Sequence, residues 1–413
     1  MKYLSLLLKI IIISLMVFSI NVSCAKAEVY DDYETYNLYA EVIKASDETT
    51  LNDGYATYKV QNLKVKILDE KFKNQEYDIV YYLEDGINSR LPIYDKFKVG
   101  DKLYVYGIYE NNELSVQAAS YYDKTPWVIG ILVIYAALIL VIGGKNGLKA
   151  ILSLAVTVFI IFAFLIPAIL DGKSPILFTI LLSSIIIIIS FVIVAGFKKK
   201  TIVAIIGTVA GVVAAGIIGA VFSNAMRLTG INEHARMIST IIDESKEMIS
   251  FKDIMLSAIM ISALGACMDV GMSISSALSE LKERKPELTS KELIKSGMNI
   301  GKDVMGTMTN TLILAYVGSA MLCILLYNAN SFDLSFILNS EDITDEVLKS
   351  LAGSIGLVCT IPFTAILGGI IIGNDSKKSL NKGKKETKSD VQNSKKEYNK
   401  ADTEEVPVNY FKG

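Results

Sequence analysis

Two acidic side chains lie in or beside strongly apolar segments of this 413-residue chain. Asp269 lies well inside the apolar segment 254–278, and Asp303 immediately precedes the apolar segment 304–327. A carboxylate inside a membrane is costly unless it faces water, a partner group or the interior of a helix bundle. Asp269 is therefore a candidate proton or cation site, and the alternative is a structural carboxylate that hydrogen-bonds to a neighbouring helix.

Small and hydroxyl side chains accompany Asp269 at helical spacing. Intervals of three and four residues place five side chains on one helix face, namely Ser262, Gly265, Asp269, Ser273 and Ser276. Because this face is polar in an otherwise apolar segment, Ser273 joins Asp269 as a candidate for ion binding or transport.

The segment around Asp303 shows a second polar face. Within Gly297–Gly318, the side chains of Asp303, Gly306 and Asn310 share one side of the predicted helix. The basic loop before this segment places Lys302 and Asp303 at the cytoplasmic surface, where they are candidates for part of a gate. The alternative is structural: Asp303 favours a helix N-terminus, Lys302 extends to the interface, and Asn310 hydrogen-bonds between helices.

The composition is that of a membrane protein. Hydrophobic residues make up 52% of the chain, its mean hydropathy is +0.42, and several uncharged runs reach the roughly 18 residues of a bilayer span. We predict an all-α polytopic membrane domain over residues 127–373 with about seven transmembrane helices. These spans are predicted at 127–143, 148–170, 174–196, 201–224, 254–278, 304–327 and 350–373.

Several glycines in these spans favour close packing of helices. Gly207 and Gly211 begin a series of small residues at four-residue intervals, a pattern that lets helix backbones approach each other. Gly265, Gly301 and Gly306 are predicted to act in the same way beside the two carboxylates. We therefore assign these five glycines to helix packing.

The charge pattern predicts the topology. Residues 1–27 combine two early lysines, an apolar core and an Ala-x-Ala site, which predicts a cleaved signal peptide, with an uncleaved anchor as the alternative. Lysine-rich loops follow the first, third and fifth spans, and the positive-inside rule makes them cytoplasmic. The chain is thus predicted in the cell membrane, with residues 28–126 extracytoplasmic and the disordered basic tail 374–413 in the cytoplasm.

Residues 28–126 are predicted to form a small β domain. Short alternating stretches indicate five strands, which suggests an OB-like barrel or a sandwich. These strands are predicted at 57–61, 63–68, 76–83, 102–109 and 113–118. The acidic balance of the domain argues against a nucleic-acid partner, and its many tyrosines fit either half-exposed strands or a ligand-binding face.

Several classes of site are disfavoured by the residues available. A single histidine, His234, rules out a histidine metal cluster within one chain, and no cysteine pair has zinc spacing, so we expect no metal and no cofactor. Pro167 stands where Gly172–Ser174 would need the upstream glycine of a phosphate-binding loop. A hydrolase built on Asp269 and Asp303 lacks an assembled acid, base and nucleophile, so we predict that the chain is not an enzyme.

Longer motifs point to a known family. They lie at 143–148 (GGKNGL), 194–197 (VAGF), 263–270 (ALGACMDV), 273–277 (SISSA) and 296–308 (SGMNIGKDVMGTM), followed by Asn310-Thr311-Leu312. The chain resembles the YibE/F family of bacterial multi-pass membrane proteins over roughly residues 40–327, although the family usually has an arginine where Lys302 stands. The resemblance implies a membrane protein of a kind often suspected to be a permease, and it implies no particular substrate.

We therefore predict a secondary transporter or permease with a polar path between the fifth and sixth spans. Asp269 would bind a proton or cation, and Lys302 and Asp303 would form part of the gate. The alternative is an envelope assembly or signalling component whose outer domain binds a partner. The expected partners are the lipid bilayer and an unknown small solute or ion, and a homo-oligomer or another membrane partner stays open.

Overall fold

The computed structural model describes residues 34–52, 57–83, 96–110, 113–241 and 250–373. The chain divides into two compact units, Val22–Gly144 and the residues from Lys145 onward together with Met1–Asn21. The first unit holds a β barrel and the first part of a helix, and the second holds a helix bundle. The predicted signal peptide and the predicted basic tail lie outside the described residues.

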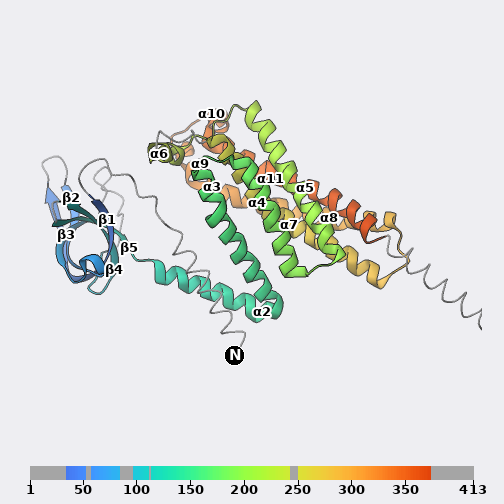
Figure 1. Ribbon diagram of the computed structural model, residues 1–413. Helices are drawn as coiled ribbons and strands as arrows, with labels where there is room; N and C mark the ends of the chain where they lie inside the picture. The colour runs from blue at the N-terminus through green and yellow to red at the C-terminus, as the bar shows by residue number, and fades with distance from the viewer. Residues whose placement is uncertain (1–33, 53–56, 84–95, 111–112, 242–249, 374–413) are drawn as a thin grey trace, which may run out of the picture. The chain divides into compact units, whose positions relative to one another are not determined.

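Five antiparallel strands form a barrel-like sheet in the first unit (Figure 1). The strands are β1 (Glu34–Asn52), β2 (Thr57–Ile67), β3 (Glu76–Tyr82), β4 (Lys102–Glu110) and β5 (Glu113–Tyr122), and the short helix η1 spans Glu70–Phe72. The sheet order is β3-β2-β1-β4-β5, and β3 also approaches β5. The long strand β1 is therefore the centre of the sheet and pairs with both β2 and β4.

Alternation along the strands gives the barrel an apolar interior. Leu38, Ala40 and Val42 on β1 and Leu103 and Val105 on β4 are all buried, while the residues between them are more exposed. Successive side chains of a strand point to opposite faces, so a period of two selects the inward side. The barrel core is built from these inward side chains and their counterparts on β2 and β3.

The observed strands differ from the predicted ones near the start of the domain. The predicted segments 57–61 and 63–68 form the single strand β2, and the 19-residue strand β1 lies where no strand is predicted. Pairing of β1 with β2 shifts register at two places, which follow Val42 and Ala45. Such irregularities interrupt the alternation on which strand prediction depends.

The rest of the described chain is helical (Figure 1). The elements are α2 (Thr125–Ile160), the π-helical turn η2 (Ile161–Leu165), α3 (Ile166–Leu170), α4 (Pro175–Ala195), α5 (Lys199–Ala225), α6 (Glu233–Ile241), α7 (Phe251–Arg284), α8 (Ser290–Ser319), α9 (Met321–Ala329), α10 (Leu334–Asn339) and α11 (Glu341–Ile371). The boundary between the two units falls inside α2, at Gly144.

In the described part of the chain, five helical runs are long and apolar enough to cross a membrane, and the pair α8 and α9, bent by 56°, adds a sixth if it is one span. The first two predicted spans lie in a single run, Thr125–Leu170. This run of 46 residues is about 69 Å long, more than twice the roughly 30 Å of a bilayer core. Gly144 interrupts it with φ 50° and ψ −123°, a conformation that suits glycine. The length therefore suffices for two spans that meet at Gly144.

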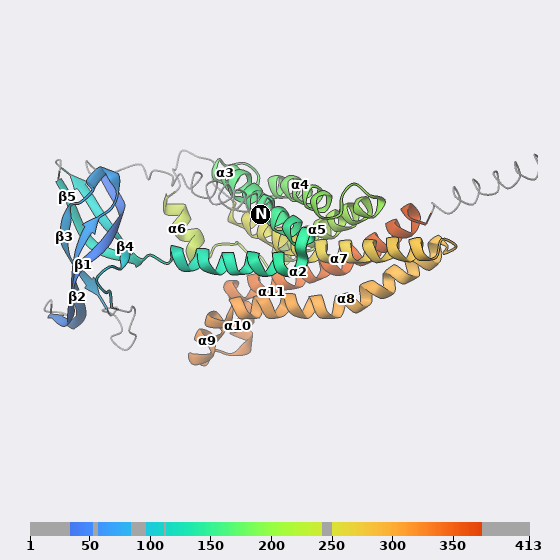
Figure 2. The same ribbon diagram turned by 90° about the horizontal axis from the view of Figure 1, so that it is seen from below.

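Helix α11 is the centre of the bundle and packs against α5, α7 and α8 (Figure 2). Two glycines of α5 let the backbones of α5 and α11 approach each other closely. A Cβ on Gly207 would collide with Thr364, and a Cβ on Gly211 would collide with Thr360 and lie only 2.8 Å from the carbonyl oxygen of Gly356. Side chains at these two positions would push α5 and α11 apart, so the pair depends on their absence.

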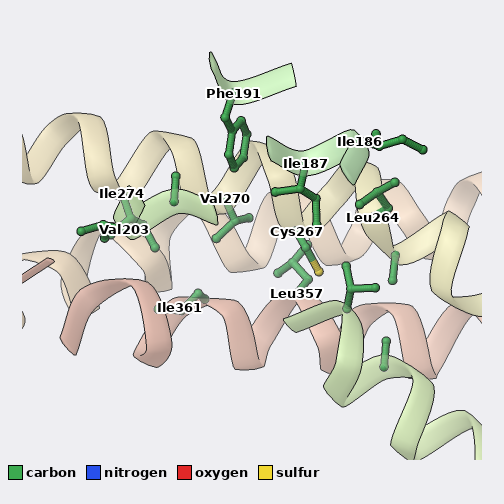
Figure 3. Packing of buried hydrophobic residues seen from close by; sticks show 14 of the residues in the cluster. Ile186, Ile187, Phe191, Val203, Leu264, Cys267, Val270, Ile274, Leu357 and Ile361 are labelled. Carbon is green, nitrogen blue, oxygen red and sulfur yellow. The ribbon is translucent and has the colours of Figure 1, made fainter. Parts of the chain in front are cut away.

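The core of the bundle is apolar where α4, α7 and α11 meet. Ile187 and Phe191 of α4 lie over Cys267 and Val270 of α7, and Leu357 of α11 lies on the other side of Cys267 (Figure 3). All five side chains are at most 3% exposed. This packing determines which side of α7 faces the bundle.

Helices α7 and α8 form a hairpin with a defined turn. Thr289 and Glu292 make a reciprocal capping box at the start of α8, and the spacing Thr-x-x-Glu is the sequence signal of such a helix start. Lys282, which is buried near the end of α7, donates hydrogen bonds from Nζ to the carbonyl oxygens of Pro286 (2.9 Å) and Leu288 (2.6 Å). These bonds hold the turn between the two helices.

Candidate functional site

The two carboxylate candidates lie on α7 and α8, and both helices are positioned by α11. Gly301 of α8 packs on Ile361 of α11. Gly297, about one turn before Gly301 on α8, packs on Ala365, which is about one turn after Ile361 on α11. Helix α8 therefore runs antiparallel to α11. Asp303 is two residues beyond Gly301, about 3 Å further along the axis, and is level with residue 359 of α11.

Helix α7 runs parallel to α11. Gly271 of α7 lies beside Thr360 of α11. Ala263, eight residues before Gly271 on α7, lies near Gly353, which is seven residues before Thr360 on α11. Asp269, two residues before Gly271, is about 3 Å back along the axis and is level with the turn of α11 that precedes Thr360. Asp269 and Asp303 consequently lie at nearly the same height on neighbouring antiparallel helices.

Two polar strips contain these carboxylates. We call them the α7 strip, consisting of Ser262, Gly265, Asp269 and Ser273, and the α8 strip, consisting of Lys302, Asp303, Gly306 and Asn310. Because the two helices are antiparallel, a residue before Asp269 on α7 is level with the residue the same number of positions after Asp303 on α8. Ser262 is therefore level with Asn310, and Gly265 differs in height from Gly306 by one residue. The strips thus match each other in height over about two helical turns.

Both strips face away from the bundle core. Gly265, Asp269 and Ser273 are exposed, whereas Val270 and Ile274 on the other side of α7 are fully buried. The four residues of the α8 strip are exposed as well. A membrane carboxylate in this position needs water or a partner rather than the bundle interior.

The charged groups of the strips have no partners among the described residues. Ser262 Oγ donates to the carbonyl oxygen of Ile259 at 2.8 Å, which satisfies this hydroxyl within its own helix. Asp269, Lys302 and Asp303 make no hydrogen bond or ion pair with any residue in the described part of the chain. Two carboxylates and one ammonium group are therefore available to a ligand. Among the same residues, no three His, Cys, Asp or Glu side chains gather closely enough to hold a metal ion.

The glycines of the strips differ from those that pack helices together. A Cβ on Gly301 would collide with α11, as it would at Gly207 and Gly211. Apart from the neighbouring residues and nearby backbone of the same helix, no described atom lies within 4 Å of a Cβ built on Gly265 or Gly306. The packing role predicted for these two glycines has no contact to support it in the described part of the chain, and their small size instead leaves space beside the carboxylates.

The position of Asp303 on α8 differs from that expected from the sequence. Helix α8 begins at Ser290, so Asp303 lies 13 residues, or about 20 Å, from its N-terminus. The helix dipole acts mainly within the first turn, and the dipole interpretation of Asp303 is therefore wrong. Lys302 and Asp303 lie beside the middle of α11 rather than near its end at Ile371.

A second polar cluster lies in the first turns of α11, and none of its residues is among the candidates predicted from the sequence. Lys349 Nζ is 2.7 Å from Asp345 Oδ2 and 3.0 Å from Glu346 Oε1, and the three side chains are 18%, 14% and 30% exposed. This stretch is helical and belongs to the first turns of α11. The spacing of Lys349 three and four residues after two acids is the signal that indicates such a cluster.

Comparison with known proteins identifies a family for most of the helical region. The model of the YibE/F-like protein family matches residues 131–374. This range is more than half of the chain, includes both polar strips and excludes the barrel strands. No curated protein and no solved structure matches the chain.

Proposed function

The chain belongs to the YibE/F-like protein family, and from this premise we propose that it is a secondary transporter or permease that moves a small solute or ion across a membrane. The family match and the long apolar helices support a membrane protein. The proposal of transport rests on one observation, which is the equal height of Asp269 and Asp303 on two exposed polar strips.

The charges of the strips suit a monovalent cation or a proton. Two carboxyl groups, Asp269 and Asp303, and one amino group, Lys302, give the site a formal net charge of −1. Binding one proton or one monovalent cation neutralises it. A neutral site costs less to enclose within a membrane than a charged one, and this difference would couple occupancy to a change of conformation.

The neutral residues of the strips have complementary roles in this proposal. Ser273 and Asn310 supply oxygen atoms that replace water around an ion, and Gly265 and Gly306 leave the space in which the ion or solute passes. Helices α7 and α8 pack against each other, and in this proposal the polar path follows the seam between them.

Proteoliposomes containing the full chain provide the test. Proton entry is followed with an internal pH dye while a potassium diffusion potential drives it, and entry of sodium is followed in parallel. Asp269→Asn removes the charge that binds the cation, so we expect cation or proton flux to fall at least about tenfold. Glu287→Gln, in the exposed turn between α7 and α8, is the matched control and should keep the parental flux. Parental flux in Asp269→Asn would contradict the mechanism.

The barrel supports a second candidate function, an envelope assembly or signalling component that binds a partner. The strand order, with β3 approaching β5, favours the OB-like assignment. Tyr39, Tyr104 and Tyr121 lie directly opposite one another across β1, β4 and β5, and Tyr121 is 68% exposed. Three aromatic rings abreast form a surface suited to a partner.

Deletion of the barrel separates the two functions. The variant joins residues 1–27 directly to Lys124 and so lacks the barrel. It should retain ion flux in proteoliposomes if the α7 and α8 strips form the transport path. Loss of the cellular phenotype in this deletion, together with an unchanged phenotype in Asp269→Asn, would favour the partner-binding function instead.

A further inference from the structure

Five lysines gather at one end of the helix bundle, around the turn that joins α4 to α5. We call them the lysine cluster, and they are Lys145 and Lys149 of α2 and Lys198, Lys199 and Lys200 at the start of α5. Lys149 Nζ donates to the carbonyl oxygen of Val194 at 3.4 Å, which places this end of α2 beside the end of α4. Thr201 Oγ1 donates to the carbonyl oxygen of Gly196 at 2.7 Å, so the start of α5 lies there as well.

The charges of the lysine cluster are not balanced within the described part of the chain. Lys145, Lys198 and Lys200 make no hydrogen bond or ion pair with any described residue. The hydrogen bond of Lys149 goes to a backbone carbonyl group, which carries no formal charge. Lys145 and Lys149 are four residues apart on one helix, a spacing at which like charges repel each other. An anion between these ammonium groups would offset the repulsion.

Acidic side chains are scarce around the lysine cluster. Residues 125–232 contain one acid, Asp171, which precedes the start of α4 and therefore lies at the other end of that helix. Helix α7 ends on the same side of the bundle as the cluster. Its Glu280 pairs with Arg284 at 2.8 Å, and its Glu283 accepts a hydrogen bond from the same helix. The anion that the cluster needs must therefore come from outside the described residues.

The surroundings of the turn favour an anion that is attached to an apolar body. Helices α4 and α5 are both long and apolar enough to cross a membrane, so their shared turn would lie beside the headgroups of a bilayer. Phe197, immediately before Lys198, is 88% exposed, and an aromatic ring beside lysines suits this depth. No side chain caps the start of α5, so the N–H groups of its first turn add to the positive potential.

The second half of α2 has apolar contacts with the bundle at its far end. Ile160 is buried in the bundle core, and Val156 packs against that core. At the near end, Lys145 and Lys149 are exposed. An anion held by lysines of both α2 and α5 would therefore fix the near end of α2 against the turn between α4 and α5.

We propose that the lysine cluster binds the phosphate of an anionic phospholipid, which bridges α2 and the start of α5. The phosphate oxygens accept hydrogen bonds from Lys149 and Lys198, and the acyl chains lie along exposed apolar side chains such as Leu154 and Ile188. A zwitterionic lipid adds a cationic group that the cluster repels, so the site prefers an anionic headgroup. The proposal is independent of the transport function, because it uses no residue of either strip.

The probes are phosphatidylglycerol and phosphatidylcholine with identical acyl chains. The delipidated full chain in detergent is titrated with each lipid, and native mass spectrometry counts the bound molecules. We expect the first phosphatidylglycerol to bind at least about tenfold more tightly than the first phosphatidylcholine, because several lysines face one phosphate. Lys149→Gln and Lys198→Gln should each reduce this preference about fivefold, and the double variant should bind both lipids alike. Lys173→Gln removes the same charge at the other end of α4 and should keep the parental preference.

Two further measurements test the bridge and the source of the phosphate. Phosphatidylglycerol should raise the unfolding temperature of the parent and leave that of the double variant unchanged. Glycerol phosphate, which has the phosphate but no acyl chains, should not displace the lipid at equal concentration. The proposal is overturned if the parent binds both lipids equally, or if the preference survives in the folded double variant. Displacement by glycerol phosphate would also overturn it, because the ligand would then be a soluble anion.

Discussion

Tyr39 and Asp123 connect the central strand of the barrel to its last residues. Tyr39 Oη donates to Asp123 Oδ2 at 2.6 Å, and the backbone N–H of Thr125 donates to Asp123 Oδ1 at 2.9 Å. The hydrogen bond to Asp123, followed by burial, raises the pKa of Tyr39 to about 12. Burial raises the pKa of Asp123, but the hydrogen bonds from Tyr39 and Thr125 outweigh it, so this pKa lies below its ordinary value of 3.8.

The two shifts predict opposite pH limits for the barrel. The lowered pKa of Asp123 gives stability that is present above pH 3.8 and is lost as the pH falls through the folded-state value. The raised pKa of Tyr39 gives stability that is present below pH 10.0 and is lost as the pH rises towards about 12. Urea unfolding of the full chain, followed by tyrosine circular dichroism between pH 3 and 8, checks the acid limit.

Two variants separate the contributions of this pair. Tyr39→Phe should lower the stability of the barrel by about 1 kcal/mol near neutral pH and remove the loss above pH 10.0. Asp123→Asn should remove its part of the acid dependence. If both variants keep the parental pH profile, the hydrogen bond does not stabilise the barrel.

At the scale of elements, the sequence predicts the helices better than it predicts their orientation. The turn at Pro286 and the start of α8 at Thr289 are visible in the sequence, because capping residues and proline have local effects. Periodicity also predicts that Asp269 shares a face with Gly265 and Ser273. It does not show that this face points away from the core, because orientation depends on which neighbouring helices cover α7.

The elements that the sequence misses have irregular or mixed patterns. Strand β1 escapes prediction because its register shifts break the alternation. The cluster of Asp345, Glu346 and Lys349 escapes because an acidic stretch resembles a surface loop until the packing of α11 buries it. Contacts between residues far apart in the sequence determine both the pairing of β1 and the burial of this cluster. Such contacts cannot be inferred from the local pattern of a single sequence.

The packing of α5 against α11 gives a prediction with an internal control. Gly211→Ala places a methyl group against Thr360 and near the carbonyl oxygen of Gly356, so we expect a loss of about 1–3 kcal/mol of stability. Gly265→Ala places the same group in open space and should be neutral or stabilising by up to about 1 kcal/mol. Thermal unfolding of the full chain in detergent measures both, and a Gly211→Ala protein as stable as Gly265→Ala would refute the close contact.

For the whole molecule, the predicted topology puts the barrel outside the cell and the turn between α7 and α8 in the cytoplasm. A membrane-impermeant maleimide applied to intact cells tests this arrangement. We expect Asp47→Cys, at an exposed position of β1, to be labelled, and Glu287→Cys to be labelled only after the cells are opened. The parent chain measures the background from its own cysteines. If Glu287→Cys is labelled in intact cells and Asp47→Cys is not, the orientation is the opposite of the predicted one.

The hydrogen bonds of Lys282 have a mechanical consequence. They tie the end of α7 to the carbonyl oxygens of Pro286 and Leu288, immediately before the capped start of α8. Sliding α8 lengthwise past α7 would break the bonds from Lys282, so the hairpin resists shear and moves as one rigid body. The heights of Asp269 and Asp303 then stay matched during any motion. Any movement of the hairpin is then a tilt or roll of this rigid body against α11.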